Sequence, residues 1–274
     1  MLLFPNAKIN LGLNILRKRP DGYHDIETVF YPVNLTDALE VVPSVVGGSC
    51  NLHLSGIHIG GDPAKNLVVK AYDLLAVRFE LPPVDVYLHK VIPFGAGLGG
   101  GSSDAADMLL MLRDSFKLPL SDDDLSRYAS QLGADCAFFI RNRPMLAHGI
   151  GDEMEEIGIT LSGYSIVLVK PAVMVSTPEA YAGVTPRIPE VTLSDIIKLP
   201  IREWQGRLVN DFEPSVFAKY PQISKVKDDM YRMGALYASM SGSGSSVFGI
   251  FEQIPEELSL YFVNDFVYTG ECRF

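Results

Sequence analysis

Residues Pro93–Ala106 read PFGAGLGGGSSDAA and hold five glycines in the seven positions from Gly95 to Gly101. Glycine reaches positive φ angles and, because it lacks a Cβ atom, lets a ligand approach the backbone closely. Alternating apolar residues predict a strand over Val84–Val91 before this run, and an Ala-, Leu- and Met-rich segment predicts a helix over Ser102–Phe116 after it. The order strand, glycine loop, helix is typical of an oxyanion site.

The start of the predicted helix adds to what the glycines offer. Its first N–H groups have no partner within the helix, and its dipole places partial positive charge at the same end. Successive N–H groups of a glycine loop form a concave nest for the same kind of anion. Ser102 and Ser103 are expected to cap the helix and to offer hydroxyls to a phosphate or a metal ion. The stretch therefore predicts a phosphate site made mostly from backbone groups.

Two other glycine motifs fit this stretch less well. A Walker A loop requires Lys and then Ser or Thr after its last glycine, whereas Gly101 is followed by Ser102. Gly95, Gly97 and Gly100 satisfy the GxGxxG pattern of a dinucleotide site, but the chain is predicted to be helical where an acidic residue should end a strand. A flexible glycine hairpin is the plain alternative, and the flanking strand and helix favour phosphate binding over it.

Composition limits the class of protein. The chain has 274 residues, 47% of them hydrophobic, and a formal net charge of −10. It can bury a sizeable core, and its charge argues against nucleic acid or an anionic membrane as the main partner. Three cysteines without CxxC spacing form neither a disulfide framework nor a zinc site, so we expect a cytoplasmic protein. No membrane span is expected, because Lys170 and Pro171 interrupt the longest apolar stretch. No signal peptide is expected, because the N-terminal stretch lacks a basic leader and a cleavage-like segment.

The other elements are expected in mixed order, with hairpins early, so the predicted fold class is α+β. A boundary near residue 155 would divide the chain into an N-terminal domain 1–155 and a C-terminal domain 156–274. Asn66 and Ser121 are expected to cap the helices that follow them. Further strands are predicted over residues 8–16, 27–33, 38–42, 49–54, 165–169 and 247–251, helices over 66–79, 121–132, 195–198 and 222–233, and a loop at 176–178.

Three segments together resemble one known family. Ala7–Leu11 (AKINL) with Arg19–His24 (RPDGYH) resembles the first motif of the GHMP kinase superfamily, the glycine run its second, and Ser239–Ser246 its third. The similarity extends from residue 7 to about residue 251. The triple-glycine form GLGGGSS and the DGYH element resemble one branch, the 4-diphosphocytidyl-2-C-methyl-D-erythritol kinases. The resemblance implies a two-domain GHMP kinase fold, with an N-terminal ATP-binding domain and a smaller C-terminal domain that contributes to the substrate cleft.

Two charged residues stand in apolar surroundings. Lys8 lies within a predicted apolar strand, where a buried ammonium requires a carboxylate or phosphate partner, or else it faces water from the strand's exposed side. Asp135 follows Leu132-Gly133-Ala134 and could simply cap a helix. The resemblance implies a catalytic pair. Asp135 takes the proton of the acceptor hydroxyl or only orients that hydroxyl, and Lys8 keeps the Asp135 carboxylate ionised. Cys136-Ala137 replaces the family's usual Val-Pro after the aspartate, which changes the local backbone stiffness and the exact pose of Asp135 but not the chemistry.

The resemblance also implies binding residues. Asn10, Tyr23 and His24 match the branch's substrate element, and Tyr181 matches a second aromatic side chain around a cytosine ring. The plain alternatives are a turn aromatic for Tyr23 and a core residue for Tyr181. On the ATP side the implied residues are Pro93, Gly95, Ala96, Gly97, Leu98, Gly99, Gly100, Gly101, Ser102, Ser103, Asn66, Leu67 and Lys90. For the last three, a helix cap, a core leucine and a surface lysine are the alternatives.

The activity implied is ATP-dependent phosphorylation of the 2-hydroxyl of 4-diphosphocytidyl-2-C-methyl-D-erythritol, in the non-mevalonate route to isoprenoid precursors. Mg²⁺ should bridge the ATP phosphates, with Ser103 as the first candidate ligand and no metal ligand assigned. The expected state is a monomer or a homodimer.

Three alternatives stay open at this point. A sister kinase acting on homoserine, mevalonate or a sugar would lack DGYH. A dinucleotide-dependent oxidoreductase would bind a nicotinamide cofactor, and an inactive nucleotide-binding module would lack Lys8 or Asp135.

Overall fold

The computed structural model describes residues 1–45, 47–58, 60 and 62–272. Its helices and sheets come in mixed order, which confirms the predicted α+β class. The chain forms two compact units, each assembled from separated parts of the sequence. The first unit holds Met1–Ala7, Leu35–Phe94 and Gly99–Asn142, and the second holds Lys8–Asn34, Gly95–Leu98 and the chain from Arg143 onward.

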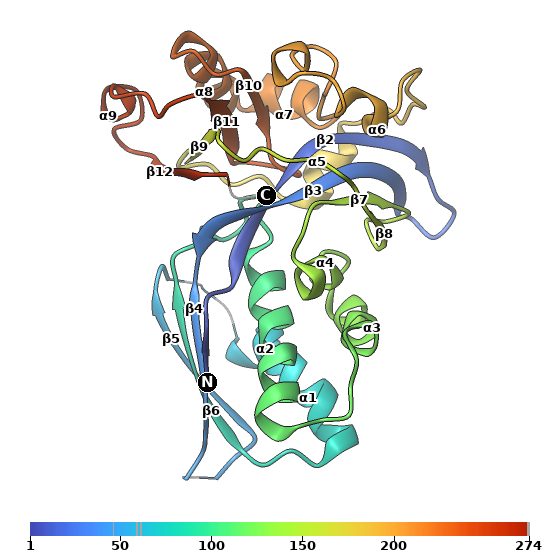
Figure 1. The fold of residues 1–274 in the computed structure, drawn as a ribbon, viewed down its shortest axis with the longest axis vertical. Helices are drawn as coiled ribbons and strands as arrows, with labels where there is room; N and C mark the ends of the chain where they lie inside the picture. Colours follow the sequence, from blue (N-terminus) through green and yellow to red (C-terminus); the bar gives the residue numbers. More distant parts are fainter. Residues whose placement is uncertain (46, 59, 61, 273–274) are drawn as a thin grey trace. The chain divides into compact units, whose positions relative to one another are not determined.

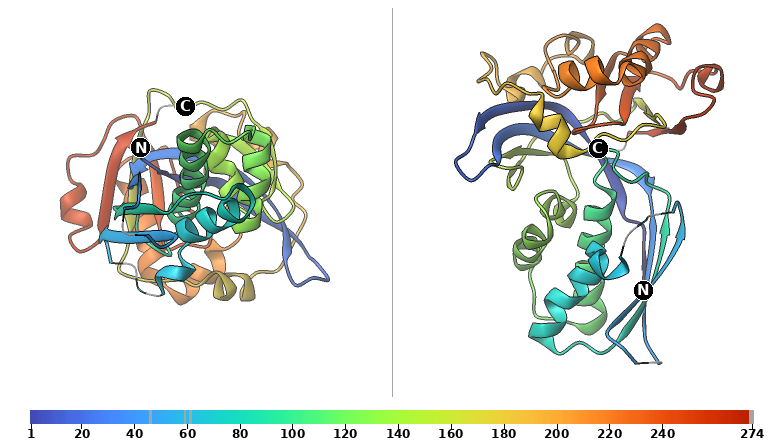
Figure 2. Two further views of the ribbon diagram at one scale, coloured as in Figure 1. Left: turned by 90° about the horizontal axis from the view of Figure 1, so that it is seen from below. Right: turned by 180° about the vertical axis from the view of Figure 1, so that it is seen from behind.

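The first unit is a four-stranded sheet with helices on one face. In Figure 1, α1 and α2 lie against the sheet, and α3 and α4 pack beyond them; Figure 2 shows the same layers from behind. β5 pairs in parallel with β6, and the other pairings are antiparallel. The strand order is β1 (Leu2–Leu3), β4 (Ala38–Pro43), β6 (Val84–Lys90) and β5 (Cys50–Gly56), and the helices are η1 (Pro63–Lys65), α1 (Leu67–Phe79), α2 (Gly100–Phe116), α3 (Asp122–Leu132) and α4 (Cys136–Arg141).

Local sequence explains the regular parts of this unit. Along β6 the buried positions alternate with more exposed ones, so one face of the strand packs on the helices. The Asn66 side chain accepts a hydrogen bond from the N–H of Val68 and caps α1, as predicted. Ser121 and Asp124 form a capping box at the start of α3, which confirms Ser121 as its cap.

The second unit contains two sheets, and its helices follow later in the chain. β2 and β3 are long neighbouring strands joined by a turn (Figure 1), and α8 packs on β10 and β11. One sheet has the order β2 (Asn6–Lys18), β3 (His24–Thr36), β7 (Met145–His148) and β8 (Glu153–Glu156). The other has the order β10 (Tyr237–Met240), β11 (Val247–Phe251), β9 (Ser165–Lys170) and β12 (Phe266–Glu271), and the helices are α5 (Thr177–Ala182), α6 (Leu193–Ile196), η2 (Ile201–Glu203), α7 (Glu213–Lys219), α8 (Pro221–Arg232) and α9 (Leu258–Tyr261).

The predicted strands and helices are all present within a few residues of their expected bounds. Two expectations are wrong in detail. α2 begins at Gly100 rather than Ser102, and the predicted loop at residues 176–178 is the start of α5, with Ser176 as its N-cap. The elements that the sequence analysis missed are short: β1, β7, β8, β10, β12, α4, α5, α7 and α9. No helix in the described ranges is long and apolar enough to cross a bilayer.

The linear division at residue 155 stays a prediction. The two compact units cut across it, because β2 and β3, which form a long hairpin near the N-terminus, belong mostly to the second unit. Only the tertiary contacts reveal this arrangement, since a hairpin has the same alternating pattern whichever sheet it joins.

Candidate active site

The glycine loop ends in a helix whose first turn offers backbone donors. Gly95, Gly97 and Gly99 have φ angles of 61°, 75° and 71°, a region that favours glycine. Gly99 is the N-cap of α2 and supplies no side-chain hydrogen bond, so the predicted capping by Ser102 and Ser103 is wrong. The helix starts earlier because Gly100 has no Cβ, which would lie 2.8 Å from Cγ2 of Ile92. Without a capping side chain, the first N–H groups of α2 are left for a ligand.

The middle of the loop belongs to the second unit, where it meets the third motif. A Cβ on Gly97 would lie 2.0 Å from the carbonyl oxygen of Ser241, so only glycine fits. The Ser241 hydroxyl donates to the Gly97 carbonyl at 2.9 Å, and the N–H of Ser246 donates to the Ala96 carbonyl at 3.2 Å. The N–H of Lys8 donates to the Leu98 carbonyl at 2.9 Å. All three sequence motifs therefore come together in this unit.

Asn210 holds the third motif in place. Its amide nitrogen donates to the carbonyls of Met240 and Gly242, both at 2.8 Å, and its side chain is buried. Asn210 lies outside the three motifs, shortly before α7, and nothing in its local sequence distinguishes it from an ordinary loop asparagine. Sequence reasoning missed it for that reason.

Lys8 is buried, with 3% of its surface exposed, so the alternative of a lysine facing water is wrong. Its ammonium donates to Oδ1 of Asn10 at 2.7 Å and lies 4.7 Å from the centre of the Phe30 ring. The Asn10 amide donates to Oγ1 of Thr28 at 2.9 Å, and the Thr28 hydroxyl donates to the Gly12 carbonyl at 2.6 Å. This chain of hydrogen bonds fixes the orientation of both Lys8 and Asn10 on β2. Thr28 and Phe30, on β3, were not predicted.

Two of the four predicted acceptor residues, His24 and Tyr181, form an aromatic surface in the second unit. The rings of His24 and Tyr181 are stacked with centroids 4.7 Å apart and planes 19° from parallel. Tyr181 also meets Phe212 edge-on, so it is both packed against the core and part of this surface. Burial, with a smaller effect of Lys18, lowers the pKa of His24 and favours the neutral imidazole. Tyr23 is 61% exposed at the hairpin turn, where its side chain is accessible to a ligand.

Asp135 stands immediately before α4 in the first unit. It occupies the N-cap position, but its side chain makes no capping hydrogen bond, which removes the plain alternative. Cys136 is buried next to it, and α4 packs on α2. Burial raises the pKa of the Cys136 thiol to about 11, which excludes a nucleophilic role at neutral pH. Lys8 and Asp135 belong to different units, and their pairing stays a prediction.

Three predicted ATP-side residues also lie in the first unit. Asn66 caps α1, and Cδ1 of Leu67 would be 3.9 Å from a Cβ on Gly101, so Leu67 borders the start of α2. Lys90 is 3% exposed and contacts the carboxylates of Asp37 and Asp104, so it is not a surface lysine. Burial raises the pKa of Asp104, while the ammonium of Lys90 acts in the opposite direction and favours the ionised carboxylate. Whether these residues contact ATP stays a prediction.

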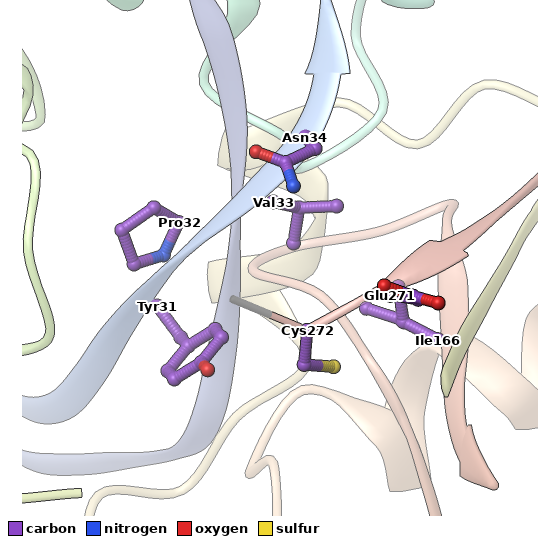
Figure 3. A pocket seen from close by; sticks show the side chains of 7 residues that line it. All are labelled: Tyr31, Pro32, Val33, Asn34, Ile166, Glu271 and Cys272. Carbon is purple, nitrogen blue, oxygen red and sulfur yellow. The ribbon is translucent and has the colours of Figure 1, made fainter. Parts of the chain in front are cut away.

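Neither a metal-binding cluster nor the depression in Figure 3 adds a candidate site among the described residues. No group of three His, Cys, Asp or Glu side chains in the described residues could hold a metal ion. Figure 3 shows a shallow depression with the end of β3 on one side and Cys272 on the other. Burial raises the pKa of the Cys272 thiol to about 12, so it carries no reactive group there. The side chains that line it include none of the predicted residues: Tyr31, Pro32, Val33, Asn34, Ile166, Glu271 and Cys272.

Comparison with known proteins agrees with this geometry. Family models for the GHMP kinases N terminal domain and the GHMP kinases C terminal domain match residues 66–143 and 200–266. The chain is 56% identical over 260 residues to the 4-diphosphocytidyl-2-C-methyl-D-erythritol kinase of Bacteroides fragilis, covering 94% of this chain and 93% of the relative. The chain belongs to this family of GHMP kinases. As a GHMP kinase it uses ATP, and the family predicted from the three motifs is confirmed.

Solved structures separate this kinase from its sister families. A crystal structure of 4-(cytidine 5'-diphospho)-2C-methyl-D-erythritol kinase matches with a TM-score of 0.83 and 31% identity over the whole of both chains. A homoserine kinase from Cytophaga hutchinsonii matches with a TM-score of 0.65 and 17% identity, over 98% of this chain and 95% of that one. The homoserine kinase shares the fold alone, and a dinucleotide-dependent oxidoreductase is excluded.

Proposed function

We propose that this GHMP kinase transfers the γ-phosphoryl group of ATP to the 2-hydroxyl of 4-diphosphocytidyl-2-C-methyl-D-erythritol, giving the 2-phosphate and ADP. The observation that carries the proposal is the meeting of three motifs in the second unit. The backbone of Lys8 is bonded to the glycine loop at Leu98, and Ser241 holds the same loop at Gly97. The DGYH element lies on the hairpin that carries Lys8, so one segment brings both a cation and an aromatic surface.

Phosphoryl transfer depends on positioning and on stabilising negative charge. The uncapped start of α2 and the glycine backbone are suited to hold the ATP phosphates. Lys8 would stabilise the charge that develops on the transferring group. Asp135 would orient the acceptor hydroxyl and take its proton as the new P–O bond forms and the bond to the ADP oxygen breaks.

The acceptor carries a cytosine ring, which has a π face and a hydrogen-bonding edge. His24 and Tyr181 are already stacked, and Tyr23 is exposed beside them in sequence. Tyr23 and Tyr181 would contact the faces of the ring, while the neutral His24 imidazole and Asn10 offer polar groups to the substrate. This arrangement favours a nucleotide-linked acceptor over homoserine or mevalonate, which have no aromatic ring.

Mg²⁺ fits the start of α2 chemically. The Ser103 hydroxyl is buried in the first turn and has no hydrogen-bond partner among the described residues. A hydroxyl oxygen with phosphate oxygens is the kind of hard ligand set that Mg²⁺ prefers, so we propose Ser103 as the protein ligand. The ion would neutralise charge on the β- and γ-phosphates when ATP is bound.

An ADP-release assay with different acceptors tests the proposal. We expect activity with 4-diphosphocytidyl-2-C-methyl-D-erythritol and background rates with homoserine, mevalonate and galactose. A high rate with one of the other acceptors and none with the cytidine compound would contradict the proposed substrate.

Asp135→Asn tests the proposed chemistry separately from the substrate. The variant should lose turnover by about a thousandfold or more, because the amide cannot accept the hydroxyl proton, while ATP binding measured by calorimetry stays near that of the wild type. Near-normal turnover would remove Asp135 from the mechanism. Within this proposal the enzyme acts in the cytoplasm, as a monomer or a homodimer, in isoprenoid precursor synthesis.

A further inference from the structure

Three buried charged side chains meet in the first unit beside the start of α2. Lys90 is the last residue of β6, Asp37 lies between β3 and β4, and Asp104 is the fifth residue of α2, just after its first turn. The Lys90 ammonium contacts Oδ2 of Asp37 and lies 2.5 Å from Oδ2 of Asp104. All three residues are at most 3% exposed. One lysine therefore joins three elements that are distant in sequence.

The same three side chains hold both ends of the glycine loop. Oδ1 of Asp37 accepts hydrogen bonds from the N–H groups of Val91 and Ile92, at 2.6 and 2.8 Å, where the chain leaves β6 for the loop. Asp104 lies on α2 immediately after the first turn, which follows the loop. A Cβ on Gly100 would lie 3.5 Å from the Lys90 ammonium, so the lysine reaches the first residue of α2.

Stability alone does not account for such a cluster. Well-packed apolar residues often stabilise a core as much as buried ions do, because removing charges from water is costly. Here Oδ1 of Asp104 is buried with no hydrogen-bond partner among the described residues, which adds to that cost. Charged side chains make directional contacts, which apolar side chains cannot. Each such contact fixes a backbone segment at a set distance.

We infer that Asp37, Lys90 and Asp104 form a clamp that sets the position of the phosphate-binding backbone, and that Lys90 acts through this backbone rather than by touching the nucleotide. Lys90 is thus a positioning residue. The inference rests on the proposed use of the glycine loop and the start of α2 for ATP phosphates, and it reassigns the role that the sequence resemblance implied for Lys90.

Kinetics of Lys90→Met, Asp104→Asn and the double variant test the clamp. A displacement of about 1 Å at a reacting group can lower the rate by a hundredfold, so we expect Lys90→Met to lower kcat/KM for ATP by about that factor. Asp104→Asn should lower it by about tenfold, and KM for the acceptor should stay within about twofold in both. Because the two residues act as one unit, the double variant should be no worse than Lys90→Met.

Asp229→Asn is the matched control. Asp229 is a carboxylate with 2% exposure between Lys225 and Arg232 on α8, in the other unit. It should lower the melting temperature to a similar extent as Asp104→Asn and leave kcat/KM for ATP unchanged. A control that lowered kcat/KM for ATP equally would show that general destabilisation, rather than the clamp, explains the result.

Two outcomes would overturn the inference. Wild-type kcat/KM for ATP in Asp104→Asn and Asp37→Asn would do so. These variants decide the question if Lys90→Met does not fold, because each keeps Lys90 with one carboxylate. Effects of Lys90→Met and Asp104→Asn that multiply would show that Lys90 acts independently. Calorimetric titration with a non-hydrolysable ATP analogue repeats the comparison without an acceptor, so a wrong acceptor assignment would leave this result unaffected.

Discussion

Lys8 and Lys90 are equally buried, each with 3% of its surface exposed, yet their surroundings differ. Lys90 meets the carboxylates of Asp37 and Asp104 inside the first unit. Lys8, in the second unit, donates to the uncharged amide of Asn10 and faces the ring of Phe30. Burial alone therefore does not assign a role to a lysine. The segments that each lysine joins differ: Asp37 and Asp104 tie Lys90 to the two ends of the glycine loop. Asn10 and Phe30 orient Lys8 on the hairpin that carries the first motif.

The largest expected effect separates the two lysines by activity. Lys8→Met should lower kcat by about a thousandfold, because it removes a charge that stabilises the transferring phosphoryl group. The similar length of methionine should keep the melting temperature within a few degrees of the wild type. Steady-state kinetics and thermal melting measure both quantities. Normal kcat in a folded Lys8→Met protein would break the comparison, since both lysines would then be structural.

The second prediction separates the same two lysines by stability. Lys90→Met leaves Asp37 and Asp104 buried without their cation, so it should lower the free energy of unfolding by about 3 to 5 kcal/mol. Urea unfolding followed by circular dichroism measures the loss. Adding Asp104→Asn should restore part of it, because one of the two facing carboxylates becomes neutral. A Lys90→Met protein as stable as the wild type would contradict the ion contacts.

A third prediction concerns the aromatic surface on the hairpin that carries Lys8. Tyr23→Ala should raise KM for the cytidine acceptor by up to about tenfold, because a ring contact contributes about 0.5 to 1.5 kcal/mol. KM for ATP should not change. Tyr23→Phe keeps the ring and serves as the control, with a KM near that of the wild type. If Tyr23→Ala left KM for the acceptor unchanged, Tyr23 would not contact the cytosine.

The smallest expected effect concerns Asp107, a carboxyl group whose pKa is shifted by burial alone, in contrast to the two carboxylates that contact Lys90. Burial raises the pKa of Asp107, on α2, to about 7. An unfolded aspartate ionises near pH 4, so between about pH 4 and pH 7 the native state holds more protons and the free energy of unfolding falls as pH rises. Asp107→Asn removes this slope. It should stabilise the protein at pH 8 by about 1 kcal/mol, less than the full shift implies, because the partly exposed Asp107 side chain is screened by water, and it should not do so at pH 4.

Urea unfolding of the wild type and Asp107→Asn at both pH values checks this prediction. Asp124→Asn is a useful contrast, since the Ser121 cap lowers the pKa of Asp124 to about 2 and its contribution is present at pH 8. Equal stability of wild type and Asp107→Asn at pH 8 would show that Asp107 is not penalised by burial.

Much of the candidate site could be predicted because its parts are local. The glycine run predicts residues with positive φ angles, and Gly95, Gly97 and Gly99 have such angles. Asn66 and Ser121 cap helices through hydrogen bonds within a few residues, which a short stretch of sequence specifies. The predicted start of α2 is two residues late, because glycine is a poor helix former by propensity. The need for glycine at position 100 comes from its close packing against Ile92, which only the structure shows.

What the sequence by itself determined is therefore the backbone chemistry and the family: the phosphate-binding run, the DGYH hairpin and the order of the three motifs. Only the tertiary structure decided which distant groups meet. The carboxylates of Asp37 and Asp104 contact Lys90, from which they are separated by 53 and 14 positions in the sequence. Asn210 donates a hydrogen bond to Gly242, which lies 32 positions away. Periodicity and capping act over a few residues, whereas the partner of a buried charge is set by packing between elements, which no local pattern records.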